Sequence, residues 1–203
     1  LAIVIDDGSA SIATHFEPRA ADLGISYDVA LVTGWMNDGE GLDVDMGDGL
    51  SDRILTWQDA KTLAQTGRVG FTSHSHSQHR YADGGPEGTE SGPAITTRLW
   101  NETGRWQETN AERGLRVFDD LATSRKILEH QFGAPCTLLA WPYGVYDDIA
   151  ETAALEAGFT HFLQFDSSIF AAPRSAPQRI MRLAVTRADE AIPLAFPADA
   201  ITQ

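Results

Sequence analysis

The chain has 203 residues, 42% of them hydrophobic, and a formal net charge of −14 at pH 7. This composition predicts one domain over residues 1–203 with one substantial core. The charge argues against a nucleic-acid-binding function, because no cluster of basic residues is available to neutralise phosphates. Two interpretations of the acidity stay open: solubility in a salty or extracytoplasmic environment, and the binding of a cationic or amine-bearing ligand.

Membrane-spanning and disulfide-rich classes are not expected either. The sequence contains no apolar run of about 18 residues, the length that predicts a transmembrane helix. It begins at Leu1 without an initiator methionine or the charged and apolar regions of a signal peptide, as a mature or trimmed chain does. Its one cysteine, Cys136, excludes an internal disulfide and a cysteine-ligated zinc site.

The first predicted element is a buried strand over residues 1–5, a continuous apolar and β-branched run. It ends in Asp6-Asp7-Gly8. An Asx-type turn explains two aspartates before a glycine. If the strand is central and parallel, the same carboxylates lie where ligands collect, and one could bind a metal ion while the other acts as a base. The turn alone does not choose between these interpretations.

The next part of the chain predicts two helices and two strands around one long loop. Pro18 in a first turn and Gly24 beyond the last one indicate a short helix. Thr56 is the expected N-cap of a second helix. After the first helix, the elements are a strand at 27–33, an acidic, glycine-rich loop at 35–52, a helix at 57–65 and a strand at 69–73.

Three of the chain's six histidines follow this strand, among serines and a glutamine rather than apolar side chains. His74 and His79 are five positions apart, so their side chains converge only if the chain curls between them. Imidazoles held close together are typical of a shared metal ion. A histidine-rich polar surface loop is the alternative. His76 is expected to face solvent or to support the ligands.

The rest of the chain continues the alternation of helices and strands. A long loop at 80–93 precedes an amphipathic helix at 109–131 with a core-facing apolar stripe. The stripe consists of Leu115, Phe118, Leu121, Ala122 and Leu128. The remaining elements are strands at 137–141, 160–165 and 182–187, and a helix at 149–157 closed by Gly158. This order indicates an α/β fold with a parallel sheet and helices outside it.

Three short motifs carry a resemblance to a known family. Asp6-Asp7-Gly8, His74-x4-His79 and Trp141-Pro142-Tyr143-Gly144 occur in the order seen in polysaccharide deacetylases with a NodB-type domain, carbohydrate esterase family 4. The chain most resembles the poly-β-1,6-N-acetylglucosamine deacetylases of biofilm-forming bacteria. Leu55-Thr56-Trp57 and residues 93–99 are also similar to that branch. Each motif alone is a weak signal, but three in order on strand ends are a strong one.

The resemblance implies a fold, a reaction and a location. The fold is a distorted (β/α)7 barrel, of which this chain supplies six predicted strands. The reaction is the hydrolytic removal of N-acetyl groups from N-acetylglucosamine units of an exopolysaccharide, most specifically poly-β-1,6-N-acetylglucosamine, with release of acetate. The implied location is periplasmic, cell-surface or secreted, and the implied partner is the acetylated polysaccharide itself.

The resemblance also implies a set of site residues. Asp7, His74 and His79 are expected to bind a divalent metal ion. Zinc is the leading candidate, with nickel, cobalt and iron as alternatives. Asp6 is the expected general base, and the backbone N–H of Tyr143 the expected oxyanion donor. Two imidazoles and one carboxylate leave coordination positions open for water and substrate. The expected substrate-binding residues are Trp141, Pro142, Tyr143 and Asp166.

The sequence departs from the family pattern at two places. Ala140 stands where most members carry an arginine near the Pro-Tyr motif, which removes the usual orienting partner of the base. No histidine follows His161, whereas most members have a late Leu-x-His whose histidine is the general acid. We therefore expect an incomplete barrel whose general acid lies upstream of Leu1. A barrel closed within residues 1–203 would contradict this and make His161 the candidate acid.

Two other function classes compete with the deacetylase. A two-carboxylate glycosidase would use Asp6 and Asp166, but it leaves the histidines unexplained. Turnover without metal would identify it. A metal-bearing carbohydrate-binding domain without activity is the other alternative, and the missing acid histidine favours it. Release of acetate from an N-acetylglucosamine oligomer separates this class from the enzyme.

Overall fold

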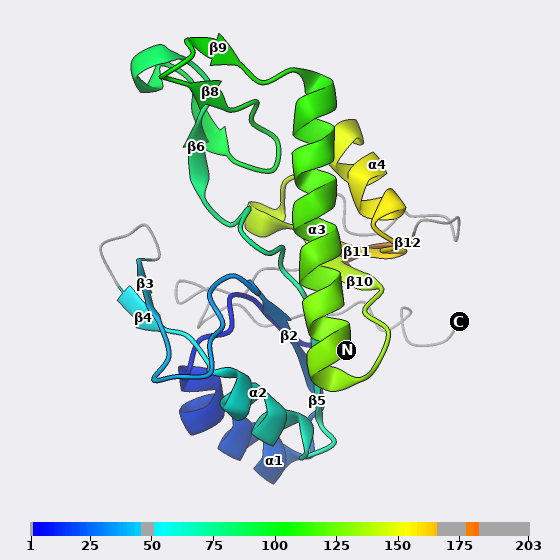
Figure 1. Cartoon of the computed structure of the whole chain (residues 1–203). Helices are drawn as coiled ribbons and strands as arrows, with labels where there is room; N and C mark the ends of the chain where they lie inside the picture. The colour runs from blue at the N-terminus through cyan, green and yellow to red at the C-terminus, as the bar shows by residue number, and fades with distance from the viewer. Residues whose placement is uncertain (1, 46–50, 166–177, 183–203) are drawn as a thin grey trace, which may run out of the picture.

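The computed structural model describes residues 2–45, 51–165 and 178–182 (Figure 1). Its centre is a six-stranded sheet in which every neighbouring pair is parallel. The strands, in their order across the sheet, are β1 (Val4–Ile5), β2 (Tyr27–Leu31), β5 (Val69–Ser73), β10 (Leu138–Ala140), β11 (His161–Phe165) and β12 (Gln178–Arg182). The predicted α/β fold is confirmed.

The order of the strands explains why the sheet curls. The strands lie across the sheet in the same order in which they follow one another along the chain. Right-handed crossovers that always advance in one direction place all connecting helices on the same face, which is the winding of a barrel. Among the described residues the strands do not close into a ring, and β1 and β12 are the two edges. This is the incomplete barrel that the sequence predicts.

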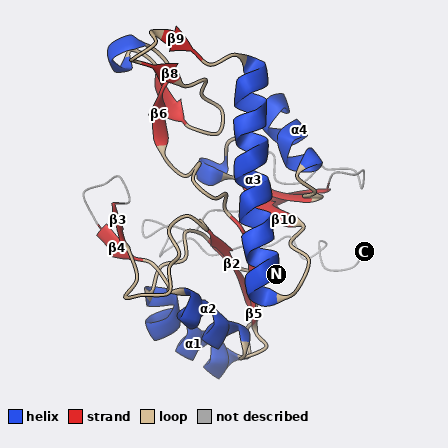
Figure 2. Cartoon of the chain, in the orientation of Figure 1, coloured by secondary structure: helices blue, strands red, loops and turns tan. Residues whose placement is uncertain are grey.

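The connecting helices begin and end at the expected signals. Thr56 and Thr109 each cap a helix in a capping box with an acidic residue three positions later. Gly24 and Gly133 end two helices in the left-handed conformation. The helices are α1 (Glu17–Leu23), α2 (Trp57–Ala64), α3 (Asn110–Phe132) and α4 (Asp148–Glu156). Figure 2 shows α3 as the longest of them, with α4 at its side.

The stripe predicted on α3 is partly wrong. Leu121 and Leu128 are buried in the main hydrophobic cluster, as expected, but Leu115 is 66% exposed. The buried face of the helix runs through Val117 and Ser124 instead. Leu115 is two residues from Val117, about 200° of helical rotation, and so points away from the sheet.

Short elements occur in and around the segments at 35–52 and 80–93 that were predicted as loops. Three of them are two-stranded antiparallel ribbons with strands of two or three residues. They are β3 (Asp43–Asp45) with β4 (Ser51–Arg53), β6 (Tyr81–Asp83) with β7 (Ser91–Pro93), and β8 (Trp100–Asn101) with β9 (Trp106–Gln107). Single helical turns are η1 (Ile12–Phe16), η2 (Pro86–Gly88) and η3 (Pro142–Gly144). Strands of two or three residues are too short to show an alternation of polar and apolar residues, so the sequence does not predict them.

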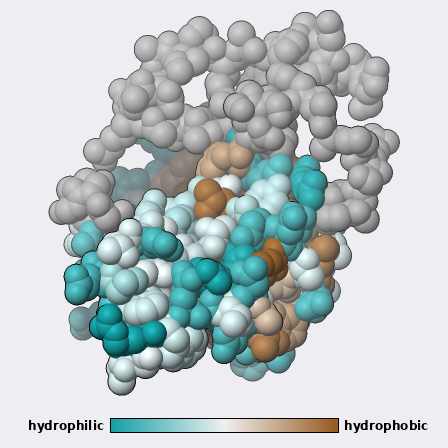
Figure 3. Space-filling model, turned by 90° about the horizontal axis from the view of Figure 1, so that it is seen from above, coloured by the Kyte–Doolittle hydropathy of each residue, from teal (hydrophilic) through white to brown (hydrophobic). Residues whose placement is uncertain are grey.

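Only the first residue of the last predicted strand, 182–187, lies within the described residues. The structure describes a strand, β12, at Gln178–Arg182. Residues 183–187 lie outside the described part of the chain. Among the described helices, none combines the length and the apolar composition needed to cross a bilayer. The visible described surface in Figure 3 is mainly hydrophilic, with separate hydrophobic residues between polar ones.

A stability measurement tests the corrected face of α3. Leu121→Ala removes a fully buried side chain and should lower the free energy of unfolding by about 2–5 kcal/mol. Leu115→Ala is the matched control on the same helix, and we expect a change within about 0.5 kcal/mol. Denaturant unfolding of both variants measures this. Equal losses would show that Leu115 belongs to the core after all.

Candidate active site

The candidate site lies at the carboxyl ends of the parallel strands. Asp6 and Asp7 follow β1, His74 follows β5, and Trp141 follows β10. Because the strands are parallel, their carboxyl ends gather on one rim of the sheet, where ligands bind in barrels of this kind. The topology thus brings together residues that are far apart in the sequence.

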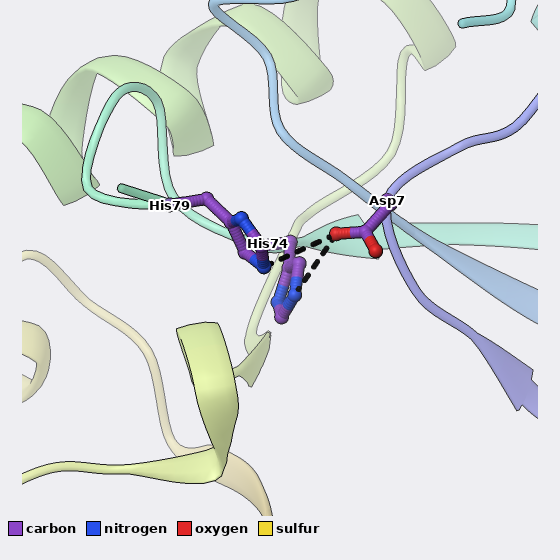
Figure 4. A group of neighbouring side chains, drawn as sticks. All are labelled: Asp7, His74 and His79. Atoms are coloured by element: carbon purple, nitrogen blue, oxygen red, sulfur yellow. Dashed lines mark ion pairs between the residues drawn. The ribbon is translucent and has the colours of Figure 1, made fainter. Parts of the chain in front are cut away.

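Asp7, His74 and His79 form one group on this rim (Figure 4). Their ligand atoms all lie within 4.8 Å of one another. Asp7 Oδ1 is 3.5 Å from His74 Nε2 and 3.3 Å from His79 Nε2. Asp7 has a φ of 72°, in the left-handed region, and Gly8 follows with a φ of 79°. A side chain at Gly8 would meet Leu31, so the close turn after Asp7 requires glycine there.

The protonation of this group suits a cation. His74 Nδ1 lies 2.8 Å from the carbonyl oxygen of Ala140, which can only accept, so Nδ1 carries the proton and Nε2 presents its lone pair. Burial lowers the pKa of His74 and of His79, because desolvation disfavours the imidazolium form. Both rings are therefore in the neutral form that ligates metals.

Asp7 supplies the test of whether a metal ion fits. Its Oδ1 is buried and has no hydrogen-bond partner among the described residues. Burial also raises the pKa of the Asp7 carboxyl, because the carboxylate is desolvated. A buried carboxylate oxygen that faces two imidazole nitrogens and no donor lacks compensation. A divalent cation would supply it, and two nitrogens with one oxygen suit zinc.

Helix α3 holds the chain between the two histidine ligands in its curled form. Asp120 accepts hydrogen bonds from the backbone N–H groups of His76 and Ser77, both at 2.8 Å, and from Ser77 Oγ at 2.6 Å. Ser75 has a φ of 75°, a strained value for a non-glycine residue. One buried carboxylate therefore fixes the turn that makes His74 and His79 converge.

Two further side chains on α3 extend this support. Ser124 Oγ lies 2.8 Å from Ser73 Oγ, and Arg116 donates to Gln78 Oε1 at 2.6 Å. Together with Asp120, these residues recur every four positions along α3 and so lie on one face. This polar stripe is not among the features predicted from the sequence, although its spacing of four within an amphipathic helix indicates it.

Aromatic rings surround His79. Its ring centre lies 4.4 Å from that of Tyr143, which is 38% exposed, and 5.1 Å from that of Trp35. Tyr81, in β6, is edge-to-face with Tyr143. Tyr143 thus lies beside His79, and its roles as oxyanion donor and substrate contact stay predictions. Trp35 and Tyr81 also belong to the rim, which the sequence analysis did not predict.

Trp141 is placed differently from the prediction. Its side chain is fully buried, and its ring stacks on Tyr146 and Phe162. The ring cannot contact a sugar, so its prediction as a substrate-binding side chain is wrong, and its packing anchors the turn that follows. Pro142 is buried as well. Asp166, the remaining substrate-binding candidate, lies outside the described residues.

His161 is not near the candidate site. It is the first residue of β11, at the amino end of a strand whose carboxyl end faces the rim, and its Nδ1 lies 2.9 Å from Thr160 Oγ1. His76 likewise turns to Thr33, whose Oγ1 is 3.0 Å from its Nδ1. Neither histidine belongs to the group formed by Asp7, His74 and His79.

Comparison with known proteins decides the family. A family model described as polysaccharide deacetylase matches residues 1–162. The chain belongs to the polysaccharide deacetylase family. It is a de-N-acetylase hydrolase with the NodB-type fold, as the sequence motifs predict. No curated protein matches the chain in sequence.

Solved structures of deacetylases resemble this one. The deacetylase domain of BpsB from Bordetella bronchiseptica is 30% identical with a TM-score of 0.77, and the match covers 89% of this chain and 69% of that one. The de-N-acetylase of Aggregatibacter actinomycetemcomitans is 24% identical with a TM-score of 0.76, over 89% and 68% of the two chains. IcaB from Ammonifex degensii is 18% identical with a TM-score of 0.63, over 92% and 67%. The last two show the shared fold alone.

The metal-ligand assignment leads to a first test at this site. We predict that the purified protein binds zinc, and that His74→Ala and His79→Ala each empty the site, because two protein ligands remain. His76→Ala is the matched control from the same loop and should retain zinc. Elemental analysis of the purified variants measures the bound metal. A full complement of zinc in His74→Ala would place the ligands elsewhere.

A second test concerns the support from α3. Asp120→Ala removes the acceptor that fixes the loop between the histidines, and zinc affinity should fall about 10–100-fold. Asp119→Ala is the control, since Asp119 is exposed on the same helix. Competition with a chromophoric chelator gives both affinities. If the two variants bind zinc equally well, the loop does not depend on Asp120.

Proposed function

We propose that this polysaccharide deacetylase removes N-acetyl groups from N-acetylglucosamine units of an exopolysaccharide. The leading candidate substrate is poly-β-1,6-N-acetylglucosamine. The proposed reaction needs a divalent metal ion, for which zinc is the leading candidate. The observation that carries the proposal is the meeting of Asp7, His74 and His79 beside Asp6 on the rim. The likeness to the BpsB deacetylase domain supports the reaction type. The sequence motifs support the β-1,6 linkage and a periplasmic, cell-surface or secreted location.

Asp6 is proposed as the general base. Its Oδ1 accepts a hydrogen bond of 2.6 Å from Arg182, while its Oδ2 lies 3.9 Å from His74 Nε2, on the side of the three ligands. A divalent ion held by those ligands would acidify a bound water and polarise the acetamido carbonyl. Oδ2 can then take the proton of the attacking water, a contribution of roughly 10²–10⁴ in rate.

The remaining steps follow from the balance of the hydrolysis. The water oxygen bonds to the carbonyl carbon, the carbon–nitrogen bond breaks, acetate leaves, and the amine nitrogen takes up a proton. The backbone N–H of Tyr143, in a turn with a φ of 57°, is the proposed donor to the oxygen on which negative charge develops. The expectation that a general acid lies upstream of Leu1 stays a prediction.

The exposed aromatic rings are the proposed contacts to the sugar. Tyr81 and Tyr143 are 62% and 38% exposed and lie next to each other beside His79. Such rings present an apolar face and a polar tip, which suits a pyranose ring. The net charge of −14 also favours a polymer that gains ammonium groups as acetyl groups are removed. The glycosidase alternative is not favoured, because it gives the three ligands no role.

Acetate release from β-1,6 and β-1,4 N-acetylglucosamine oligomers, with and without chelator, tests this proposal. Asp6→Asn keeps the size of the side chain but cannot accept a proton, so zinc should remain while the rate falls about 10²–10⁴-fold. Asp119→Asn is the control, with expected wild-type rates. Undiminished acetate release by Asp6→Asn would assign the base to another group, and chelator-resistant release would remove the metal from the mechanism.

A further inference from the structure

Arg182 joins the two edges of the sheet at the candidate site. It is the last residue of β12, and its Nη1 lies 2.6 Å from Oδ1 of Asp6, directly after β1. These residues are 176 positions apart in the sequence. The side chains of Arg182 and Asp6 are 10% and 25% exposed. The contact is therefore a largely buried, charge-assisted hydrogen bond, which is stronger than a pair on the surface.

The guanidinium group is also held from its other side. Its Cζ lies 4.5 Å from the centre of the Phe165 ring, at the end of β11. Phe165 in turn packs against Gly144, where a side chain would collide with the ring. Gly144 follows Tyr143 in the turn after β10. Contacts thus run from that turn through Phe165 and Arg182 to Asp6.

We propose that Arg182 is the positioning residue that makes Asp6, and not Asp7, the base; this inference rests on the proposed function. Neighbouring carboxylates at a strand end are chemically alike, so their surroundings must divide their roles. Arg182 occupies Oδ1 of Asp6 and leaves Oδ2 on the side of His74. Asp7 Oδ1 instead faces His74 and His79. Arg182 thereby keeps Asp6 out of the ligand set and aims its free oxygen.

This assignment explains how Asp6 is oriented although Ala140 stands where most family members carry an arginine. The side chain of Ala140 is buried among apolar residues and brings no charge to the rim. The cation that orients Asp6 comes instead from a strand two positions farther across the sheet. Among the described residues, Asp6 is the only carboxylate within ion-pair distance of Arg182.

Arg179 provides a matched comparison on the same strand. It forms a two-pronged contact with Glu151 of α4, and its side chain is 44% exposed. It carries the same charge as Arg182, three residues earlier in β12, but it lies away from the rim and ties the strand to a helix. Replacing it removes the same charge from β12 without touching Asp6.

The test compares Arg182→Ala, Arg182→Lys and Arg179→Ala in acetate release, zinc content and thermal unfolding. We expect Arg182→Ala to retain zinc and KM while kcat falls about 10²-fold, because the base is no longer aimed. Added guanidinium ion should restore part of the activity of Arg182→Ala and none in Arg179→Ala, which should behave as wild type. Arg182→Lys should recover kcat only in part, since it keeps the charge but loses the planar group that lies over the Phe165 ring.

A spectroscopic readout makes the test independent of turnover. In cobalt-substituted protein, Arg182→Ala frees Asp6 to approach the cation, so the visible absorption should change, whereas that of Arg179→Ala should not. If the wild type releases acetate and Arg182→Ala and Arg179→Ala have equal kcat values, the proposed role of Arg182 is overturned and the proposed function stands. Absence of acetate release by the wild type would overturn the proposed function, and the cobalt spectra would then still show whether Arg182 keeps Asp6 away from the cation.

A merely structural role for Arg182 predicts a different pattern. It would lower the unfolding temperature and the zinc content together with kcat, and guanidinium would restore nothing. That pattern in Arg182→Ala overturns the inference. If Arg182→Ala does not fold, Arg182→Lys carries the comparison: reduced kcat at unchanged zinc content and unfolding temperature supports a positioning role, and a wild-type kcat contradicts it.

Discussion

A buried carboxylate oxygen without a donor is the constraint on which the site depends. Asp7 Oδ1 faces two neutral imidazoles, and burial raises the pKa of its carboxyl because the charged form lacks solvation. The fold keeps this unfavourable arrangement through strong local restraints: the left-handed turn at Asp7, the glycine behind it, and the loop that Asp120 holds. A divalent cation would complete this group and supply the compensation that the buried oxygen lacks.

The two neighbouring aspartates show how a protein divides identical groups by their surroundings. Asp7 has imidazoles around it, whereas Asp6 has a guanidinium on one oxygen. The first environment suits a ligand and the second suits an oriented base. The sequence contains no sign of this difference, because the two adjacent aspartates have identical side chains. The division of roles is a property of the folded sheet.

Prediction from sequence succeeded where chemistry or periodicity fixes the residue type. The motif residues Asp7, His74 and His79 meet on the rim because parallel strands end there. Helices α2 and α3 begin at capping threonines, which are recognisable in the sequence. It failed where the partners are distant in the sequence, as for Asp120 and Arg182, which contact the site across 44 and 176 positions. It also failed for Trp141, because adjacency to a motif does not tell which way a ring faces.

The open side of the sheet and the proposed base, Asp6, lie at the same place. Among the described residues, β1 is an edge strand that pairs only with β2, so the backbone hydrogen bonds of the sheet restrain Asp6 from one side. Arg182, at the end of the opposite edge strand, restrains it from the other. An edge strand with an apolar sequence is otherwise free to pair or to shift. Because Asp6 bridges the two edges through its side chain, the orientation of this proposed base depends on how closely β12 approaches β1.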